Sequence, residues 1–308
     1  MASLLAEKTP AAARSALDSA AQQTWLQRAA LRFARQRVSM AATLVLLLIM
    51  LAAVFAPVIT RHDPNEQFRR DGKDKTGLPV GPGPKFWLGT DGLQRDMFSR
   101  LVFGARTTLL VGVAASVFAV LVGLAWGSVA ALSGSSTENA MMRAVDVLMS
   151  LPTFFVIMLF IVVLQQRSLA LTIFVIIFAS WTYPARVFRA EVLSLKERDF
   201  VTASRSLGAS SFSIFMRHLL PQLLPLIVIY ASLGVPAAIF TEAGLSYLGL
   251  GVPPPDPVWG GMIQEGRLYY RAAPMLVILP GLAIMVTVIC FNLLGSGLRD
   301  ALDPTVGG

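Results

Sequence analysis

Charged residues are scarce in this sequence of 308 residues. Asp, Glu, Lys and Arg together make up 14% of it, whereas a soluble domain carries about 25%. Hydrophobic residues reach 55%, and the mean hydropathy is +0.65. Six stretches contain no charged residue: 38–60, 107–136, 147–166, 168–185, 218–241 and 272–298. Six such segments would leave a soluble fold almost no polar surface, so the composition excludes an ordinary soluble protein.

The lengths of these stretches indicate what they do instead. A helix needs about 20 apolar residues to cross a hydrocarbon core roughly 30 Å thick. Each of the six stretches has 18 residues or more, and charged loops separate them. The sequence therefore predicts an all-α, polytopic membrane protein with six transmembrane helices.

The residues that usually carry chemistry are also few. Cys290 is the only cysteine, so no intramolecular disulfide can form. The two histidines, His62 and His218, stand apart and have no metal-ligand spacing. The only Gly-Lys pair, Gly72-Lys73, lacks the upstream glycine and the following Ser or Thr of a phosphate-binding P-loop. We therefore expect no catalytic site, metal or cofactor in this chain, and a protein that is not an enzyme.

Six spans place both termini on one side of the membrane. Basic residues close to the span ends favour the cytoplasmic side for the termini. Arginines beside an apolar helical stripe in the N-terminal tail suit an interfacial helix that contacts anionic lipid, and the alternative is a frayed basic tail before the first span. The net charge of +8 is scattered over both faces and forms no groove for nucleic acid. The predicted organisation is a cytoplasmic N-terminal tail with an amphipathic helix (1–37), a first transmembrane helix (38–60), an extracytoplasmic loop (61–104), a core of helices 2–6 (105–296, with a loop at 191–220) and a cytoplasmic C-terminal tail (297–308).

The loop between the fourth and fifth spans has the pattern of a docking element. Small residues at Thr202-Ala203-Ser204 are followed by Gly208 and then by the aromatic residues Phe212 and Phe215. This order predicts a short helix, a glycine break and a second helix with an apolar stripe. Small residues permit close approach of a partner, and exposed aromatics can enter a groove on it. The alternative is an amphipathic connector that lies in the membrane interface.

The same loop carries a family resemblance. Thr202-Ala203-Ser204, Gly208 and His218-Leu219-Leu220-Pro221 resemble the E-A-A-x3-G-x9-I-x-L-P loop of ABC importer membrane subunits. Over roughly residues 38–304 the chain resembles the C-type permease subunit of dipeptide and oligopeptide importers. Four further segments carry this resemblance: Leu88–Arg100, Arg143–Asp146 with Pro152, Glu242–Gly251 with Trp259-Gly260, and Phe291–Pro304.

The sequence also departs from the family pattern. Thr202, Ser204 and His218 replace the glutamate, second alanine and isoleucine of the loop motif. Gln94 stands where the family usually has glycine, so a turn that needed a positive φ there would be strained.

The resemblance implies the transmembrane fold of a type I ABC importer in a bacterial inner membrane. The chain would form half of a translocation pathway for di- or oligopeptides. Its partners would be a homologous second permease, two ATPase subunits that hold ATP and magnesium, an extracytoplasmic substrate-binding protein and membrane lipid. The residues implied in coupling to the ATPases are Thr202, Ala203, Ser204, Gly208, Phe212 and Phe215.

Four polar residues near the membrane are candidates for other roles. Arg143 and Asp146 are spaced to pair on one helix face. Glu242 is a candidate for contact with peptide amines or for a gate, or else for a cap or a loop salt bridge. Asn292 is a candidate for the pathway or for a hydrogen bond between helices.

Two other transport functions remain open. A permease for nickel or another small solute would share the same motifs. A secondary transporter would need ionisable groups in mid-membrane, and the six uncharged stretches supply none. A channel is disfavoured by the docking loop.

Overall fold

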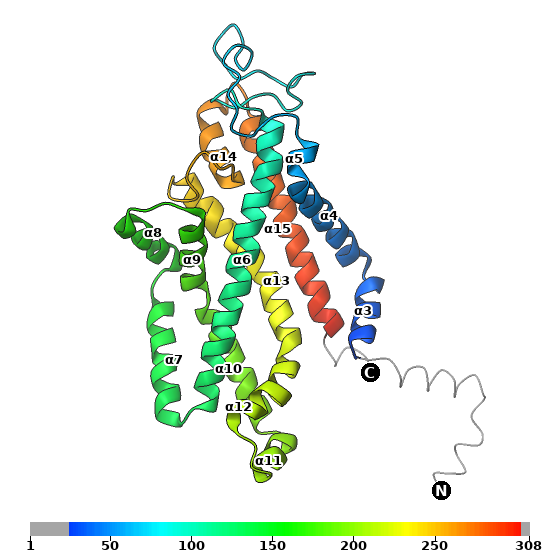
Figure 1. The fold of residues 1–308 in the computed structure, drawn as a ribbon, viewed down its shortest axis with the longest axis vertical. Coiled ribbons are helices and arrows are strands. Elements are labelled where there is room, and N and C mark those ends of the chain that lie inside the picture. The colour runs from blue at the N-terminus through cyan, green and yellow to red at the C-terminus, as the bar shows by residue number, and fades with distance from the viewer. Residues whose placement is uncertain (1–24, 303–308) are drawn as a thin grey trace, which may run out of the picture.

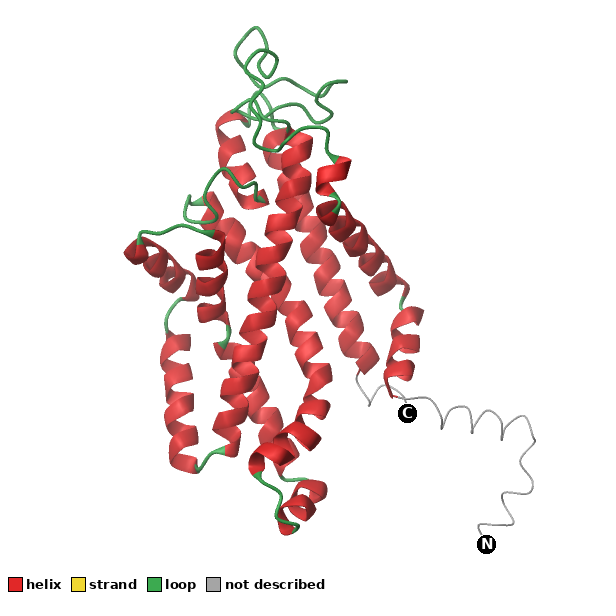
Figure 2. Cartoon of the chain, in the orientation of Figure 1, coloured by secondary structure: helices red, strands yellow, loops and turns green. Residues whose placement is uncertain are grey.

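The computed structural model describes residues 25–302 and is a bundle of helices (Figures 1 and 2). Within that range it contains no strand beyond two isolated bridges in the loop before α6, so the all-α prediction is confirmed. The helices are α3 (Trp25–Arg35), α4 (Arg37–Val54), α5 (Ala56–Ile59), α6 (Met97–Leu132), α7 (Ser135–Ser150), α8 (Thr153–Leu164), α9 (Leu169–Ser180), α10 (Thr182–Lys196), α11 (Asp199–Ser206), α12 (Ser211–Ile214), α13 (Leu220–Tyr247), α14 (Trp259–Gly266) and α15 (Met275–Leu302). One π turn, Phe215–Leu219, joins α12 to α13, and one 3₁₀ turn, Arg267–Tyr269, follows α14.

Four segments are long and apolar enough to cross a membrane: α4, α6, the continuous run Ser211–Tyr247 and α15. Two bent pairs of helices complete the six spans if each pair counts as one. α7 and α8 meet at 86°, and α9 and α10 meet at 45°. Pro152 accounts for the first break, because it lacks an N–H and forces the preceding Leu151 into extended backbone.

α6 is the central element of the bundle and runs almost its whole length (Figure 1). It packs against α4, α9, α10, α13 and α15. Two glycines one turn apart permit its closest contact, because a Cβ on Gly123 would lie 2.6 Å from Pro184 and a Cβ on Gly127 would collide with the Ala185 carbonyl. Small residues at this spacing let two membrane helices approach closely.

α6 also begins ten residues before the uncharged stretch that predicts it. Asp96 caps the helix, since its carboxylate accepts hydrogen bonds from the Ser99 backbone N–H at 3.0 Å and the Ser99 hydroxyl at 2.6 Å. Arg100 in the first turn is buried. Arg100 can be buried in this helix because its charge is paired with those of Asp91 and Glu265.

The bundle has two distinct ends (Figure 1). The long loop before α6 and the helix α14 lie at one end. The junction of α6 with α7, the helices α11 and α12, the helix α3 and the last turn of α15 lie at the other end. The predicted tails at 1–37 and 297–308 fall partly outside the described residues, but their described parts share the end that carries the predicted docking loop.

Candidate functional site

The predicted docking loop projects from the end of the bundle. We call residues 199–219 the coupling segment; it comprises α11, the turn at Gly208, α12 and the π turn. Gly208 has a φ of +83°, a left-handed conformation typical of glycine after a helix end. A Cβ at this position would have nothing within 4 Å. The turn therefore needs glycine for its backbone conformation, with no close neighbour in this chain.

The coupling segment presents apolar side chains to its surroundings. Leu207 is 89% exposed and Phe212 is 69% exposed. Thr202 and Ala203 are also exposed, whereas Ser204 is half-buried and donates a hydrogen bond to the Phe200 carbonyl. Exposed apolar side chains beside a projecting turn suit contact with another protein.

The six residues predicted for coupling therefore divide into two sets. Thr202, Ala203, Gly208 and Phe212 lie on the outer surface of the segment. Phe215 and Ser204 are half-buried, and Phe215 packs against the core of Val201, Ile214 and Leu219. Sequence reasoning missed Leu207. Its position directly before Gly208, at the turn, is the signal that could have identified it.

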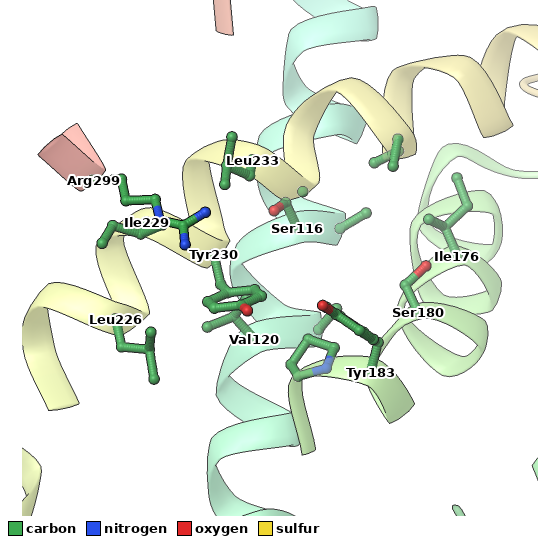
Figure 3. A pocket seen from close by; sticks show the side chains of 16 residues that line it. Ser116, Val120, Ile176, Ser180, Tyr183, Leu226, Ile229, Tyr230, Leu233 and Arg299 are labelled. Carbon is green, nitrogen blue, oxygen red and sulfur yellow. The ribbon is translucent and has the colours of Figure 1, made fainter. Parts of the chain in front are cut away.

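A cavity of about 510 Å³ lies between α6, α9, α10 and α13 (Figure 3), and it is open to the surface, because Ser180, Tyr183 and Arg299 in its wall are exposed. Its wall is mainly apolar, with four hydroxyl groups and one charged residue. The hydroxyl groups belong to Ser116, Ser180, Tyr183 and Tyr230, and the charged residue is Arg299 of α15. Such a volume lies in the range of roughly 300–1,000 Å³ that is usual for small-molecule sites.

The bend between α9 and α10 shapes this cavity. Pro184 lacks the N–H that would continue the helix back to the Ser180 carbonyl, so the helix bends where Ser180 and Tyr183 face the cavity. The rings of Tyr183 and Tyr230 lie 6.0 Å apart, and Figure 3 shows them directed toward each other. Sequence analysis did not assign this cavity, because its polar residues lie singly in apolar runs.

Glu242 and Asn292 do not line the cavity. Glu242 is fully buried in α13, where the Ser246 hydroxyl donates a 2.5 Å hydrogen bond to its Oε1. It forms neither a helix cap nor a salt bridge with any described residue, which differs from the cap or salt bridge considered from the sequence. Asn292 is exposed on α15, and none of the hydrogen bonds among the described residues involves its side chain.

A buried ion cluster joins the long loop to α14 at the opposite end of the bundle. Arg95 pairs with Asp91 at 2.6 Å and with Glu265 at 2.5 Å, and Arg100 pairs with both acids at 3.3 and 3.4 Å. The turn before Arg95 contains Gln94 with a φ of 66°. The strain expected at this glycine position is therefore present, and sequence reasoning missed the cluster that surrounds it.

The charges between α7 and α10 pair differently from the prediction. Arg186 donates a 2.6 Å hydrogen bond to Asp146 in an ion pair, whereas the predicted pairing of Asp146 with Arg143 is not among the ion pairs of residues 25–302. Arg189 pairs with Glu138. The acids of α7 therefore bind the arginines of α10 between helices, because the two helices lie in contact.

No group of three His, Cys, Asp or Glu residues that could hold a metal occurs within residues 25–302. The arrangement as a whole offers a projecting apolar segment at one end, a cavity inside the bundle and a structured loop at the other end.

Comparisons with known proteins identify the family. Residues 119–308 match the family described as binding-protein-dependent transport system inner membrane component, and residues 24–75 match the N-terminal transmembrane domain of oligopeptide transport permease C. The chain is 38% identical over 276 residues to the oligopeptide transport system permease protein OppC of Bacillus subtilis, which covers 90% of this chain and 88% of the relative. It is 39% identical over 281 residues to the glutathione transport system permease protein GsiD of Escherichia coli O6:K15:H31. That alignment covers 90% of this chain and 89% of the relative.

A solved structure supports the fold. One structure described as an inward-facing conformation of the MetNI methionine ABC transporter aligns with a TM-score of 0.54 at 21% identity. The alignment covers 67% of this chain and 98% of that chain, so the shared fold is the membrane domain of an ABC transporter. Given the match over more than half of its length and these relatives, this chain belongs to the family of inner membrane components of binding-protein-dependent transport systems.

Proposed function

We propose that this chain is the membrane-spanning permease subunit of an ATP-driven importer of di- or oligopeptides. The relatives named for oligopeptide and glutathione transport support a peptide-like substrate. The open cavity of about 510 Å³ between α6, α9, α10 and α13 supports passage of a small molecule along this subunit. A homologous second permease completes the pathway.

The coupling segment is the observation that carries this proposal. It projects beyond the bundle with Leu207 and Phe212 exposed around Gly208, and the sequence holds no P-loop of its own. The segment therefore docks on cytoplasmic ATPase subunits, which bind ATP and magnesium. The loop and α14 at the opposite end face an extracytoplasmic substrate-binding protein, and both termini are cytoplasmic.

The proposal is tested by purification and uptake. An affinity-tagged chain is extracted from its native membrane in mild detergent and assayed for associated ATPase activity. The replacement Phe212→Asp is expected to remove most of that activity from the purified material, because it places a charge on the exposed docking surface. Leu268→Asp, which changes an exposed apolar residue at the opposite end of the bundle, tests whether any new surface charge gives the same result.

Uptake in intact cells then distinguishes the candidate functions. Peptide uptake is expected to stop when the ATPases are inhibited and to persist when the proton gradient is dissipated at constant ATP. Uptake driven by the gradient alone would contradict the proposal in favour of a secondary transporter. Uptake of nickel in place of peptides would contradict the peptide assignment.

A further inference from the structure

The cavity wall carries a single charge. Sixteen residues line the cavity, and Arg299 is the one charged residue among them. No acidic side chain lies in the wall. The cavity therefore presents an environment that favours an anionic group over a cationic one.

Arg299 has no acidic partner within salt-bridge distance among residues 25–302. Figure 3 shows its guanidinium group directed toward Tyr230, on the side of the cavity formed by α13. Other described arginines form ion pairs: Arg95 and Arg100 in the outer cluster, and Arg186 and Arg189 between α7 and α10. Among residues 25–302, Arg299 thus offers a cation without an acidic partner beside the cavity.

The surrounding groups suit one ligand chemistry. A guanidinium group presents paired N–H donors that match the two oxygens of a carboxylate. The Tyr183 and Tyr230 hydroxyls can each donate a further hydrogen bond to the same anion. Arg299 and Tyr183 are exposed, so a carboxylate can reach both side chains from the open side of the cavity.

We propose that Arg299, Tyr183 and Tyr230 form a transit site for the carboxylate of a peptide, in particular its C-terminal carboxylate. This inference rests on the proposed function and names the part of the substrate that the permease itself recognises. An ammonium group has no counter-ion in this wall, so the peptide is held here by its acidic end.

The test uses two labelled peptides, a tripeptide with a free C-terminal carboxylate and the same tripeptide with a C-terminal amide. The uptake rate of each peptide is measured in cells that carry the wild-type chain and in cells that carry Arg299→Gln. The ratio of acid uptake to amide uptake is compared between the two chains, because any preference of the binding protein is common to both and cancels. We expect the ratio to fall by about tenfold in Arg299→Gln, as for the loss of a charge-assisted hydrogen bond. Arg299→Lys is expected to lie between the two, since it keeps the charge without the paired donors.

Two further variants control this comparison. Arg37→Gln removes a charge from an exposed position on α4 at the same end of the bundle, and its ratio is expected to equal that of wild type. The double variant Tyr183→Phe, Tyr230→Phe keeps Arg299 and is expected to lower the ratio by a smaller factor. This double variant provides the test if Arg299→Gln is absent from the membrane on immunoblots.

The outcomes separate the two proposals. An equal loss of acid and amide uptake in Arg299→Gln would overturn the carboxylate site and would indicate an anchor to lipid phosphate. An unchanged ratio in Arg299→Gln, or in the double variant when that is the one tested, would overturn it as well. Failure of wild-type cells to take up either peptide by an ATP-dependent route would overturn the proposed function, and the transit site with it.

Discussion

Gly208 holds a backbone conformation that residues with a side chain reach only at a cost. Its φ is +83°, and the space around a Cβ is empty. The empty space would accept a small side chain at this position, whereas the left-handed backbone conformation disfavours one. Alanine would fit the space but would strain the turn by roughly 1–2 kcal/mol.

Three substitutions at Gly208 separate the two causes. Gly208→Asn is expected to retain most ATP-dependent uptake, because asparagine enters the left-handed region more readily than other residues. Gly208→Ala is expected to lose more, and Gly208→Val the most, while all three proteins insert normally. The measurement is peptide uptake normalised to the amount of protein in the membrane.

Gly134 provides the matched control. It also lies in a turn at this end of the bundle with nothing near its Cβ, but its φ is −73°. Gly134→Ala is expected to have wild-type uptake. Equal activity of Gly208→Ala and Gly208→Asn would show that the left-handed conformation is not what coupling requires.

At the scale of elements, the contact between α6 and α10 depends on small residues. Gly127 has no room for a Cβ, because the Ala185 carbonyl occupies that space. Gly281 on α15 has nothing within 4 Å of the same position. The two glycines therefore differ in packing although both lie within helices.

Alanine at these two positions is expected to change stability in opposite directions. Gly127→Ala should lower the free energy of unfolding by about 1–3 kcal/mol, because it forces two helices apart. Gly281→Ala should be neutral or stabilising by up to about 1 kcal/mol, since alanine favours a helix. Thermal unfolding in detergent can be followed with a fluorogenic thiol reagent that reports exposure of the buried Cys290.

A lower unfolding temperature for Gly281→Ala than for Gly127→Ala would contradict this packing. The comparison needs no partner subunit, so it tests the chain by itself.

The elements also show how far the sequence could predict the structure. Four uncharged stretches coincide with the spans that contain α4, α6, α13 and α15, because burial in lipid excludes charge from a helix surface. The other two stretches mainly cover α8 and α9, since the remaining helices of the bent pairs, α7 and α10, carry charged residues. The stretches did not predict the early start of α6, since Arg100 is compensated by Asp91 in the preceding loop and by Glu265 on α14. The bends at Pro152 and Pro184 could be suspected from proline alone, but their angles depend on packing against neighbouring helices.

The candidate sites were predictable to different degrees. The coupling segment has a local pattern of small residues, a glycine and aromatic residues, so it could be placed on a projecting turn. The cavity is assembled from α6, α9, α10, α13 and α15, and no spacing within one helix indicates that Tyr183, Tyr230 and Arg299 meet. Gln94 was suspected through the family pattern, and its positive φ supports that suspicion.

At the scale of the whole molecule, the two ends of the bundle should face different compartments. The coupling segment and the ends of α3 and α15 lie together, opposite the long loop and α14 (Figure 1). Six spans, counting each bent pair as one, would place both ends of the described chain on the same side of the membrane. We expect the end with the coupling segment to face the cytoplasm.

Cysteine labelling in intact cells tests that orientation. In a Cys290→Ala background, Lys75→Cys in the long loop is expected to react with a membrane-impermeant maleimide applied to spheroplasts. Ser211→Cys in α12 is expected to react only after the membrane is permeabilised; both original residues are exposed. The reverse pattern would place the coupling segment outside and would exclude contact with cytoplasmic ATPases.

The 45° bend between α9 and α10 has a mechanical consequence. Below the bend, α10 is a rod of 15 residues, about 22 Å long, with Tyr183 near its upper end and the coupling segment just beyond its lower end. A tilt of this rod by about 10° displaces one end relative to the other by about 4 Å. Because Gly123 and Gly127 hold α6 close to α10, a tilt of α10 would move α6 with it. A displacement of the coupling segment would then change the distance between Tyr183 on α10 and Tyr230 on α13, and with it the width of the cavity.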